Sequence, residues 1–540
     1  MHPTVANYSL APPSRHLVLA LCAAYLLFGT IGHDPWKAED ATQFGIVLEF
    51  LRGGNWLVPR VVDVPLLDNP PLYHWVASAF AQALGWALPL HDAIRLTSAL
   101  FCALFLFFLH RTALLLHSPA AAVAAVLLAL GTLGILPLMH ETQPAIAWLA
   151  ALAAAYWGLA LSPARPLQAG VILGLALGFG ALFGGLTPLA MGAATALGIT
   201  AWPGWRSAKH LLALLVAFPI ALPLAAAWPL ALGMKHPDLL AAWWAQELTD
   251  LTPNLGDLNS AAQFLSMLGW YAWPAFPILA WTLWRHRREL ARREIALPIT
   301  AFCATLVVLA VAGNARTQFA LPLIPPLVLL ASLGAANMRR GAANLFDWFG
   351  VMTVTLFAGF IWLGWLAMLT GVPARLARQA TRLEPGFVMQ FHPLPVALAA
   401  LLTFAWIALL ARSPKAGLRG SLRWAAGMVL LWGLITTLWL PWIDYGKSYR
   451  GLALSLARAL PQNAQCIEEI GLAPYHRASL YYFEGLRVHP PGGKNCPLLL
   501  TWESSRNHEG LAPGPGWQKI WDGHRPGDRN ERFRLYQRQP

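Results

Sequence analysis

Residues 119–137 read PAAAVAAVLLALGTLGILP, a run without a charged side chain. A helix of about 20 apolar residues is long enough to cross the hydrocarbon core of a bilayer, where only helices and closed barrels satisfy the backbone. Comparable runs recur along the chain. We therefore expect an all-α polytopic membrane protein of about 13 spans, near residues 16–32, 94–112, 119–137, 145–161, 167–184, 186–202, 210–233, 261–284, 296–313, 320–336, 345–370, 393–411 and 424–443.

The composition supports this class. The chain has 540 residues, of which 57% are hydrophobic and 12% charged, whereas soluble domains carry about 25% charged residues. The formal net charge is +13. Much of this charge lies in short loops between apolar runs, as in cytoplasmic loops of membrane proteins. The placement argues against a nucleic-acid partner and for membrane lipids.

The basic clusters orient the chain. Arg15 precedes the first apolar run, which indicates a cytoplasmic N-terminus. No small-residue cleavage signal follows that run, so we expect it to be retained as a span. Of the dense basic clusters, only residues 375–382 fall on the other side of the membrane. An odd number of spans then places the C-terminus in the periplasm, in a multi-pass protein of the bacterial inner membrane.

The composition changes after residue 443, which divides the chain into a membrane domain, 1–443, and a small α/β periplasmic domain, 444–540. In the second domain we expect an amphipathic helix over 449–460 and a buried strand over 497–502, and 478–483 alternates like a strand.

This second domain holds Cys466 and Cys496. An oxidising periplasm would favour a disulfide between them, and two reduced core cysteines are the alternative. No cysteine pair in the chain has the spacing of a structural zinc site.

The first periplasmic loop, residues 33–91, begins HDPWKAED. It gathers Asp34, Glu39, Asp40 and Lys37 just beyond the first span. Two adjacent carboxylates at a membrane surface repel each other, which suits a site that holds a proton, a metal ion or a cationic substrate group. A solvated acidic loop is the alternative.

Further along this loop, the pair Pro70-Pro71 stops any preceding helix and can open a new one. We expect a helix over 71–90 that lies at the membrane interface. The prolines then aim Asp68 and Asn69 back toward the carboxylates.

Three segments of the loop form a series: residues 39–40 read ED, 49–59 read EFLRGGNWLVP, and 68–75 read DNPPLYHW. The series resembles the first periplasmic loop of the lipid A aminoarabinose transferases and of the wider bacterial group related to protein O-mannosyltransferases, which share the GT-C fold. Their pattern is roughly D-E-x-R-Y, R-E-M-L-x-S-G-D-W-x-x-P and E-K-P-P-L-x-Y-W. Residues 315–326, ARTQFALPLIPP, are similar to a second, weaker pattern, R-x-x-Y-x-L-P-x-x-P.

The resemblance implies a catalytic carboxylate at Glu39 and a second at Asp40. The family order is D-E, so the two are swapped here, and which of them acts stays open. Asp68 and Asn69 stand where the family has an acidic residue and a lysine. The lysine, a cation that could bind the carrier phosphate, is absent at Asn69. The second acidic position of the fold falls near Glu141, for which a polar capping turn is the alternative.

Arg316 lies at the end of an apolar run and is a candidate for the carrier phosphate, because guanidinium pairs with phosphate in a fork. An anchoring interfacial arginine is the alternative. The full set of expected substrate-binding residues is Asp34, Lys37, Asp68, Asn69, Tyr73, His74 and Arg316.

No cofactor is indicated with certainty. A divalent ion is left open at Asp68 and His236, although one histidine is weak evidence for a metal site.

The resemblance implies a glycosyltransferase that takes a sugar from a polyprenyl-phosphate carrier and transfers it, with inversion, to lipid A, another glycan or lipid, or a protein hydroxyl. The main alternative is a transporter or flippase of lipid-linked sugars. Transporters commonly show internal repeats and ionisable residues at mid-membrane, and we find no repeat in this sequence. A non-catalytic scaffold would leave the carboxylate pair unexplained.

Overall fold

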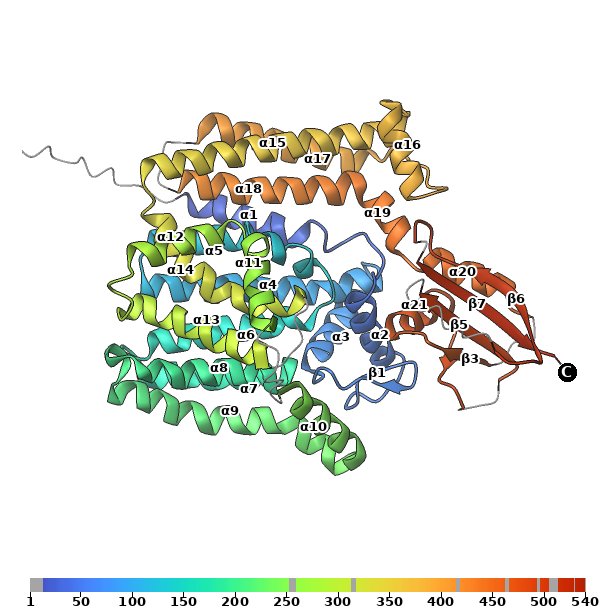
Figure 1. The fold of residues 1–540 in the computed structure, drawn as a ribbon, viewed down its shortest axis with the longest axis horizontal. Coiled ribbons are helices and arrows are strands. Elements are labelled where there is room, and N and C mark those ends of the chain that lie inside the picture. The colour runs from blue at the N-terminus through green and yellow to red at the C-terminus, as the bar shows by residue number, and fades with distance from the viewer. Residues whose placement is uncertain are drawn as a thin grey trace, which may run out of the picture.

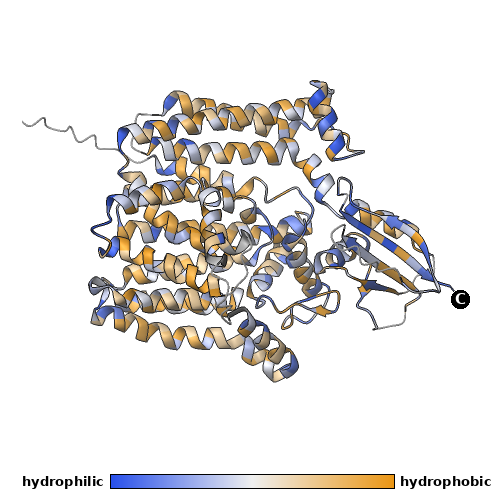
Figure 2. Ribbon diagram, in the orientation of Figure 1, coloured by the Kyte–Doolittle hydropathy of each residue, from blue (hydrophilic) through white to orange (hydrophobic). Residues whose placement is uncertain are grey.

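The structure is a computed structural model, and it describes residues 13–251, 259–311, 317–413, 418–461, 466–492, 496–504, 513–528 and 530–539. Long helices lie side by side in one bundle, and a small domain with a β-sheet sits at one end of it (Figure 1). We call this the domain end of the bundle. The helices are mainly hydrophobic along their length, whereas the domain is largely hydrophilic (Figure 2).

Eight described helices are long and apolar enough to cross a membrane. Their apolar side chains face lipid or neighbouring helices, and their backbones are satisfied internally. They are α4 (Leu90–Leu116), α6 (Pro144–Leu161), α7 (Pro166–Gly184), α9 (Ala208–Lys235), α13 (Arg293–Val311), α15 (Arg340–Thr370), α17 (Pro393–Arg412) and the stretch Arg419–Ala459, which contains α18 (Arg419–Leu434), η6 (Ile435–Trp439), α19 (Leu440–Lys447) and α20 (Arg450–Ala459).

Other apolar helices are shorter or bent. A ninth span arises if α5 (Pro119–Leu130) is joined to the following turns, which run to His140 and bend away by 54°. Shorter apolar helices are Arg15–Leu27 (α1), Leu186–Ala201 and Ala320–Ala336. They contain α8 (Leu186–Gly198), η3 (Ile199–Ala201) and α14 (Ile324–Ala336). The mostly helical, multi-span architecture is confirmed, and the number 13 stays a prediction.

One expected span is interrupted. Residues 261–284 form parts of two helices, α11 (Asn259–Tyr271) and α12 (Ala275–Arg285). Pro274 stands between them. Proline has no N–H to donate and ends a preceding helix, which explains the break.

The first loop folds at the domain end into α2 (Glu39–Leu51), a two-stranded hairpin and α3 (Leu72–Leu84). The strands are β1 (Arg60–Val61) and β2 (Val64–Pro65). Helix α3 begins directly after Pro71, as the double proline predicted. Further along the chain, α10 (Pro237–Leu251) and α16 (Ala374–Leu383) also lie near this end of the bundle (Figure 1).

The C-terminal domain contains a five-stranded sheet in the order β4-β3-β5-β7-β6. Strand β3 pairs in parallel with β4 and β5, and β7 pairs antiparallel with β5 and β6. Buried apolar residues of α20 and of the sheet form its core. The strands are β3 (Ile467–Ile470), β4 (Val488–His489), β5 (Leu498–Ser504), β6 (Trp517–Gly523) and β7 (Glu531–Arg538).

Two expectations for this domain are confirmed and one is wrong. The helix 449–460 is α20, and the strand 497–502 is β5. The alternating segment 478–483 is instead part of helix α21 (Pro474–Glu484). Pro474 at the first position and left-handed Gly485 at the end are typical helix boundaries, and they outweigh the short alternation.

A disulfide joins Cys466 and Cys496, which precede β3 and β5. It therefore ties two neighbouring parallel strands of the sheet. The expected domain boundary at residue 444 falls inside α19, so the helical stretch runs without interruption from the bundle toward the sheet.

The domain packs directly on the first loop, through α2 and α21. The two helices are in close contact at Gly45 and Ala478, where a Cβ placed on the glycine would lie 2.5 Å from the Cβ of the alanine. Arg52 at the end of α2 lies over the Tyr481 ring, 4.2 Å from its centroid. The loop with the carboxylates is thus held between the bundle and the sheet domain.

Candidate active site

Arg95, on α4, holds the start of the first loop. Its side chain is fully buried and donates to the carbonyl oxygens of His33 (2.7 Å) and Asp34 (2.8 Å). It also forms ion pairs with Asp40 (Nη2–Oδ2, 3.1 Å) and Asp92 (Nη1–Oδ1, 3.2 Å). A buried guanidinium with its donors occupied in this way fixes the backbone that leads into α2.

Asp40 is a fully occupied carboxylate. It is 1% exposed and accepts hydrogen bonds from the backbone N–H groups of Trp36 (3.0 Å) and Thr142 (2.7 Å). Burial alone would raise the pKa of Asp40, but the charge of Arg95 and the hydrogen bonds lower it to about 2. Asp40 is therefore ionised, and both of its carboxylate oxygens have partners. It maintains the geometry of the site.

Glu39, the first residue of α2, is only partly buried. Its Oε2 accepts a hydrogen bond from Gln43 Nε2 (3.0 Å), and the amide oxygen of Gln43 accepts from His74 Nε2 (2.7 Å). Burial lowers the pKa of His74 to about 3, so its imidazole is neutral. Within the described residues, Glu39 Oε1 has no hydrogen-bond partner, which makes Glu39 the carboxylate of this pair that is open to a substrate.

Glu141 lies in the turn between η2 (Leu138–His140) and α6. Ser98 Oγ donates to its carbonyl oxygen (2.6 Å). Burial and then the negative charge of Asp40 raise the pKa of the Glu141 carboxyl to about 8, although the positive charges of Lys447 and Arg95 oppose this. Glu141 therefore carries a proton at neutral pH. Neighbouring carboxyls with such different proton affinities are typical of acid–base sites.

Tyr73 and His74 lie behind this cluster. Both side chains are 0% exposed. The Tyr73 hydroxyl shares a hydrogen bond with Ser98 Oγ (2.7 Å) and accepts one from the Gln143 N–H (3.1 Å), which joins α3 to α4 and to the start of α6. The structure thus places these two expected substrate-binding residues in the supporting network, where they position Glu39 and the turn of Glu141.

Asp34 and Lys37 both pair with the C-terminal part of the chain. Asp34 accepts two hydrogen bonds from Arg450, at 2.9 and 2.5 Å, and one from Ser448 Oγ at 2.6 Å. Burial disfavours the ionised form of Asp34, but these bonds lower its pKa overall. Lys37 forms an ion pair with Glu531 of β7. These contacts fix the loop against the sheet domain.

The two expected metal residues each contact an amide side chain. Exposed Asp68 accepts a hydrogen bond from Gln246 Nε2 (2.6 Å), and His236 Nε2 lies 3.3 Å from Asn55 Nδ2. In the part of the chain that the structure describes, no group of three or more histidine, cysteine, aspartate or glutamate side chains is arranged to hold a metal ion. Asn69, next to Asp68, is half-buried.

Arg316 lies outside the described residues. Three residues that the sequence analysis did not single out do belong to the site: Arg95, Asp444 and Lys447. Asp444 Oδ1 accepts from Trp36 Nε1 (2.8 Å), and Lys447 Nζ lies 4.2 Å from the Trp36 ring centroid. An arginine at the start of an apolar run was a readable signal, but nothing in the sequence connects residues 444 and 447 with the first loop.

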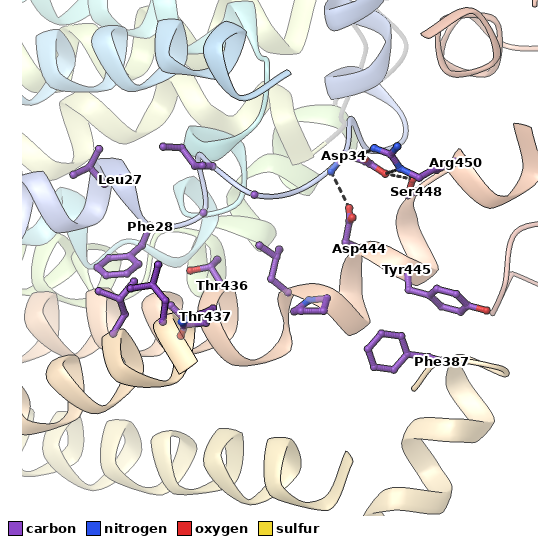
Figure 3. Close-up of a pocket in the computed structure, with 18 of the residues that line it drawn as sticks. Leu27, Phe28, Asp34, Phe387, Thr436, Thr437, Asp444, Tyr445, Ser448 and Arg450 are labelled. Carbon is purple, nitrogen blue, oxygen red and sulfur yellow. Dashed lines mark hydrogen bonds and ion pairs between the residues drawn. The ribbon is translucent and has the colours of Figure 1, made fainter. Parts of the chain in front are cut away.

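A cavity of about 1070 Å³ opens beside this site (Figure 3). Its walls are mainly apolar and come from the end of α1, from α17 and from the π-helical turn η6 with α19. At its polar end lie Asp34, Asp444, Ser448 and Arg450. Glu39, Asp40 and Glu141 are not among its lining residues. Asp34, which lines it, lies two residues before Trp36, whose N–H is bound to Asp40. Exposed Leu27, Ile31 and Leu394 are among the wall residues.

No family model matches the chain. Curated proteins that share a single name are similar to it in sequence. It is 23% identical over 348 residues to the undecaprenyl phosphate-alpha-4-amino-4-deoxy-L-arabinose arabinosyl transferase of Photorhabdus laumondii, and the match covers 60% of each chain. It is 29% identical over 234 residues to the protein of this name from Edwardsiella ictaluri, covering 40% of each. The chain thus matches less than two thirds of the length of these relatives.

The likeness to solved structures extends over nearly the whole chain. ArnT from Cupriavidus metallidurans bound to undecaprenyl phosphate matches with a TM-score of 0.68 and 15% identity, over 96% of this chain and 97% of that one. The apo state of that protein gives the same TM-score at 17% identity. The fold is therefore that of ArnT, a GT-C fold glycosyltransferase, and the resemblance read from the first loop is confirmed.

Proposed function

We propose that this chain is a glycosyltransferase that transfers a sugar from a polyprenyl-phosphate carrier to an acceptor lipid at the periplasmic face of the bacterial inner membrane. The observation that carries the proposal is the carboxyl cluster of Glu39, Asp40 and Glu141 around buried Arg95, at the domain end of a bundle with the ArnT fold. The names of the relatives, arabinosyl transferases of an undecaprenyl phosphate-linked sugar, support it.

The site supports a single displacement. The bond between the anomeric carbon and the phosphate oxygen breaks, its electron pair stays on the phosphate, and the polyprenyl phosphate leaves. The acceptor oxygen bonds to the anomeric carbon from the opposite face and, if it is a hydroxyl, gives its proton to Glu39. Asp40 and Arg95 hold the backbone at Glu39, and protonated Glu141 donates a hydrogen bond to the donor. This route inverts the anomeric configuration, and a retained configuration in the product would contradict it.

The cavity beside the site suits a lipid substrate. Its apolar walls include the exposed side chains of Leu27, Ile31 and Leu394, which would face the acyl region of the membrane. Its polar end lies next to the segment that carries Trp36. A lipid chain in the cavity would bring its head group close to the carboxyl cluster.

We also propose the topology that the basic clusters predicted: about 13 spans, a cytoplasmic N-terminus, a membrane domain over 1–443 and a periplasmic domain over 444–540. The disulfide between Cys466 and Cys496 supports a domain in an oxidising compartment. Since the domain packs on α2, the carboxyl cluster would then face the periplasm.

The sugar and the acceptor need direct measurement, because Asn69 and the order Glu39-Asp40 depart from the aminoarabinose transferase pattern. Mass spectrometry of envelope lipids should compare cells that make wild-type protein, no protein, Glu39→Gln or the control Glu484→Gln at the end of α21. We expect a sugar-sized mass with wild type and the control only. If Glu39→Gln, made at the same level, gives the wild-type product, the catalytic assignment is wrong, and a transporter of lipid-linked sugars becomes the better account.

A further inference from the structure

The donor in the proposed reaction carries a phosphate that has to be bound by a cation. At the three positions of the first loop where the family pattern has a basic residue, this chain has Thr42, Leu48 and Asn69. The Thr42 hydroxyl donates a hydrogen bond to the carbonyl oxygen of Ala38 (2.8 Å). None of these three residues carries a charge, so among the described residues the phosphate has to be bound by a basic side chain from elsewhere in the fold.

Most cations around the carboxyl cluster are already paired. Arg95 is buried and occupied by two carboxylates and two carbonyl oxygens. Lys37 pairs with Glu531, and Arg450 forms a double hydrogen bond with Asp34. A phosphate could displace none of these without leaving a buried or half-buried carboxylate unpaired, which is costly.

Lys447 is different. It is the last residue of α19, its side chain is exposed, and its ammonium has no carboxylate within ion-pair distance among the described residues. Its Nζ lies over the Trp36 ring, 4.2 Å from the centroid. Its charge lowers the pKa of Glu141 against the effect of burial, so the ammonium acts on the carboxyl cluster. All three ammonium hydrogens are available to a ligand.

Trp36 is a rigid platform for this lysine. Its Nε1 donates to Asp444 Oδ1 (2.8 Å), and its ring stacks on His33 with a centroid distance of 4.0 Å. The neighbouring backbone N–H of Trp36 is bound to Asp40. A cation over an indole ring is attracted by the ring electrons and needs no carboxylate to hold it there. Among the described residues, Lys447 is thus a cation without an ion pair, held over Trp36, which in turn is bound to Asp444 at the edge of the cavity.

We propose that Lys447 binds the phosphate of the polyprenyl-phosphate donor, in place of the basic residues that the family pattern has in the first loop. This inference rests on the proposed function. The ammonium pairs with the phosphate of the bound donor and neutralises the charge that gathers on it as the bond to the sugar breaks. Trp36 acts as a positioning residue that holds the ammonium.

The test is binding of undecaprenyl phosphate to the purified full-length protein in detergent, with undecaprenol, which lacks the phosphate, as the second ligand. We expect Lys447→Gln to weaken undecaprenyl phosphate binding about tenfold or more, and Lys447→Arg to retain most of it. Trp36→Leu should weaken it less than Lys447→Gln. Undecaprenol should bind equally to all variants. Arg458→Gln, an exposed charge on α20, is the matched control and should bind both ligands like wild type.

Two outcomes separate the inference from the function on which it rests. If wild type prefers the phosphate over undecaprenol and Lys447→Gln, with an unchanged melting temperature, keeps that preference in full, the assignment of Lys447 is wrong and the proposed function stands. If wild type shows no preference for the phosphate, both proposals are overturned.

Discussion

Glu39 and Asp40 are neighbours in the chain with opposite surroundings. Glu39 is partly exposed and bound through one oxygen to Gln43, whereas Asp40 is buried against Arg95 and two backbone N–H groups. The sequence predicted the pair but left open which carboxylate acts. The division of roles could not be predicted, because it depends on Arg95, 55 residues away on another helix.

The different surroundings predict different consequences of removing each charge. Glu39→Gln should keep the melting temperature of wild type and lower the transfer rate about 10²- to 10⁴-fold. Asp40→Asn should instead destabilise the fold by about 3–5 kcal/mol, because it removes one of the two carboxylates that pair with buried Arg95. Thermal unfolding of the two purified variants, measured beside transfer activity, checks this. Equal melting temperatures for both variants would contradict the role assigned to Asp40.

Glu141 predicts a pH dependence of stability. Its pKa in the fold is about 8, raised from 4.5, so between these values the folded protein binds a proton that the unfolded chain has lost. Stability from this group is fully present below pH 4.5 and is lost as the pH rises toward 8. Glu141→Gln mimics the protonated acid. The melting temperature of Glu141→Gln should therefore fall less than that of wild type between pH 6 and pH 8.

Melting curves of wild type and Glu141→Gln at the two pH values test this, with Glu484→Gln as the control that should follow wild type. The comparison cancels the titration of groups that the proteins share. Identical changes in wild type and Glu141→Gln would show that the carboxyl of Glu141 is ionised in the fold throughout this range.

At the scale of elements, the sequence predicted the helices better than their breaks. Helix α20 and strand β5 lie where the sequence patterns placed them, and α3 begins where the prolines predicted but ends at Leu84 instead of residue 90. The interruption at Pro274 and the helix over 478–483 were not predicted, because short apolar segments fit a helix or a strand about equally well. The packing of α2 on α21 is a contact between distant parts of the chain and leaves no local pattern.

That packing gives a prediction of its own. A side chain at Gly45 would collide with Ala478, since even a Cβ would lie 2.5 Å from the alanine Cβ. Gly45→Val should destabilise the protein by about 1–3 kcal/mol and expose the C-terminal domain to protease. Gly359→Val on α15 is the control, because its Cβ would meet no atom within 4 Å. Equal protease resistance of the two variants would contradict the tight docking of the domain.

At the scale of the whole molecule, composition and apolar runs predicted a helical membrane protein with a small α/β domain, and the comparison with ArnT confirms this architecture. The number of spans does not follow directly from the apolar runs. Several apolar helices are shorter than a full crossing, and α5 bends by 54° into the turns that follow it. Hydropathy along the chain does not report such bends.

The disulfide tests the orientation of the whole molecule. If the C-terminal domain is periplasmic, Cys466 and Cys496 should be oxidised in intact cells and react with a thiol-specific polyethylene glycol reagent only after reduction and denaturation. Exposed Cys303 should react after denaturation without reduction. Cys466 and Cys496 that react without a reductant would indicate a cytoplasmic domain and reverse the proposed topology.

The central claim is that the cluster at Glu39 transfers a sugar from a polyprenyl-phosphate donor. The most direct measurement is single-turnover transfer by purified protein in lipid nanodiscs, with a radiolabelled donor and an extract of envelope lipids as acceptor. We predict that wild type and Glu484→Gln move the label to a lipid product, and that Glu39→Gln, with the same melting temperature, binds the donor but moves none above background. Transfer by Glu39→Gln at the wild-type rate would contradict the account.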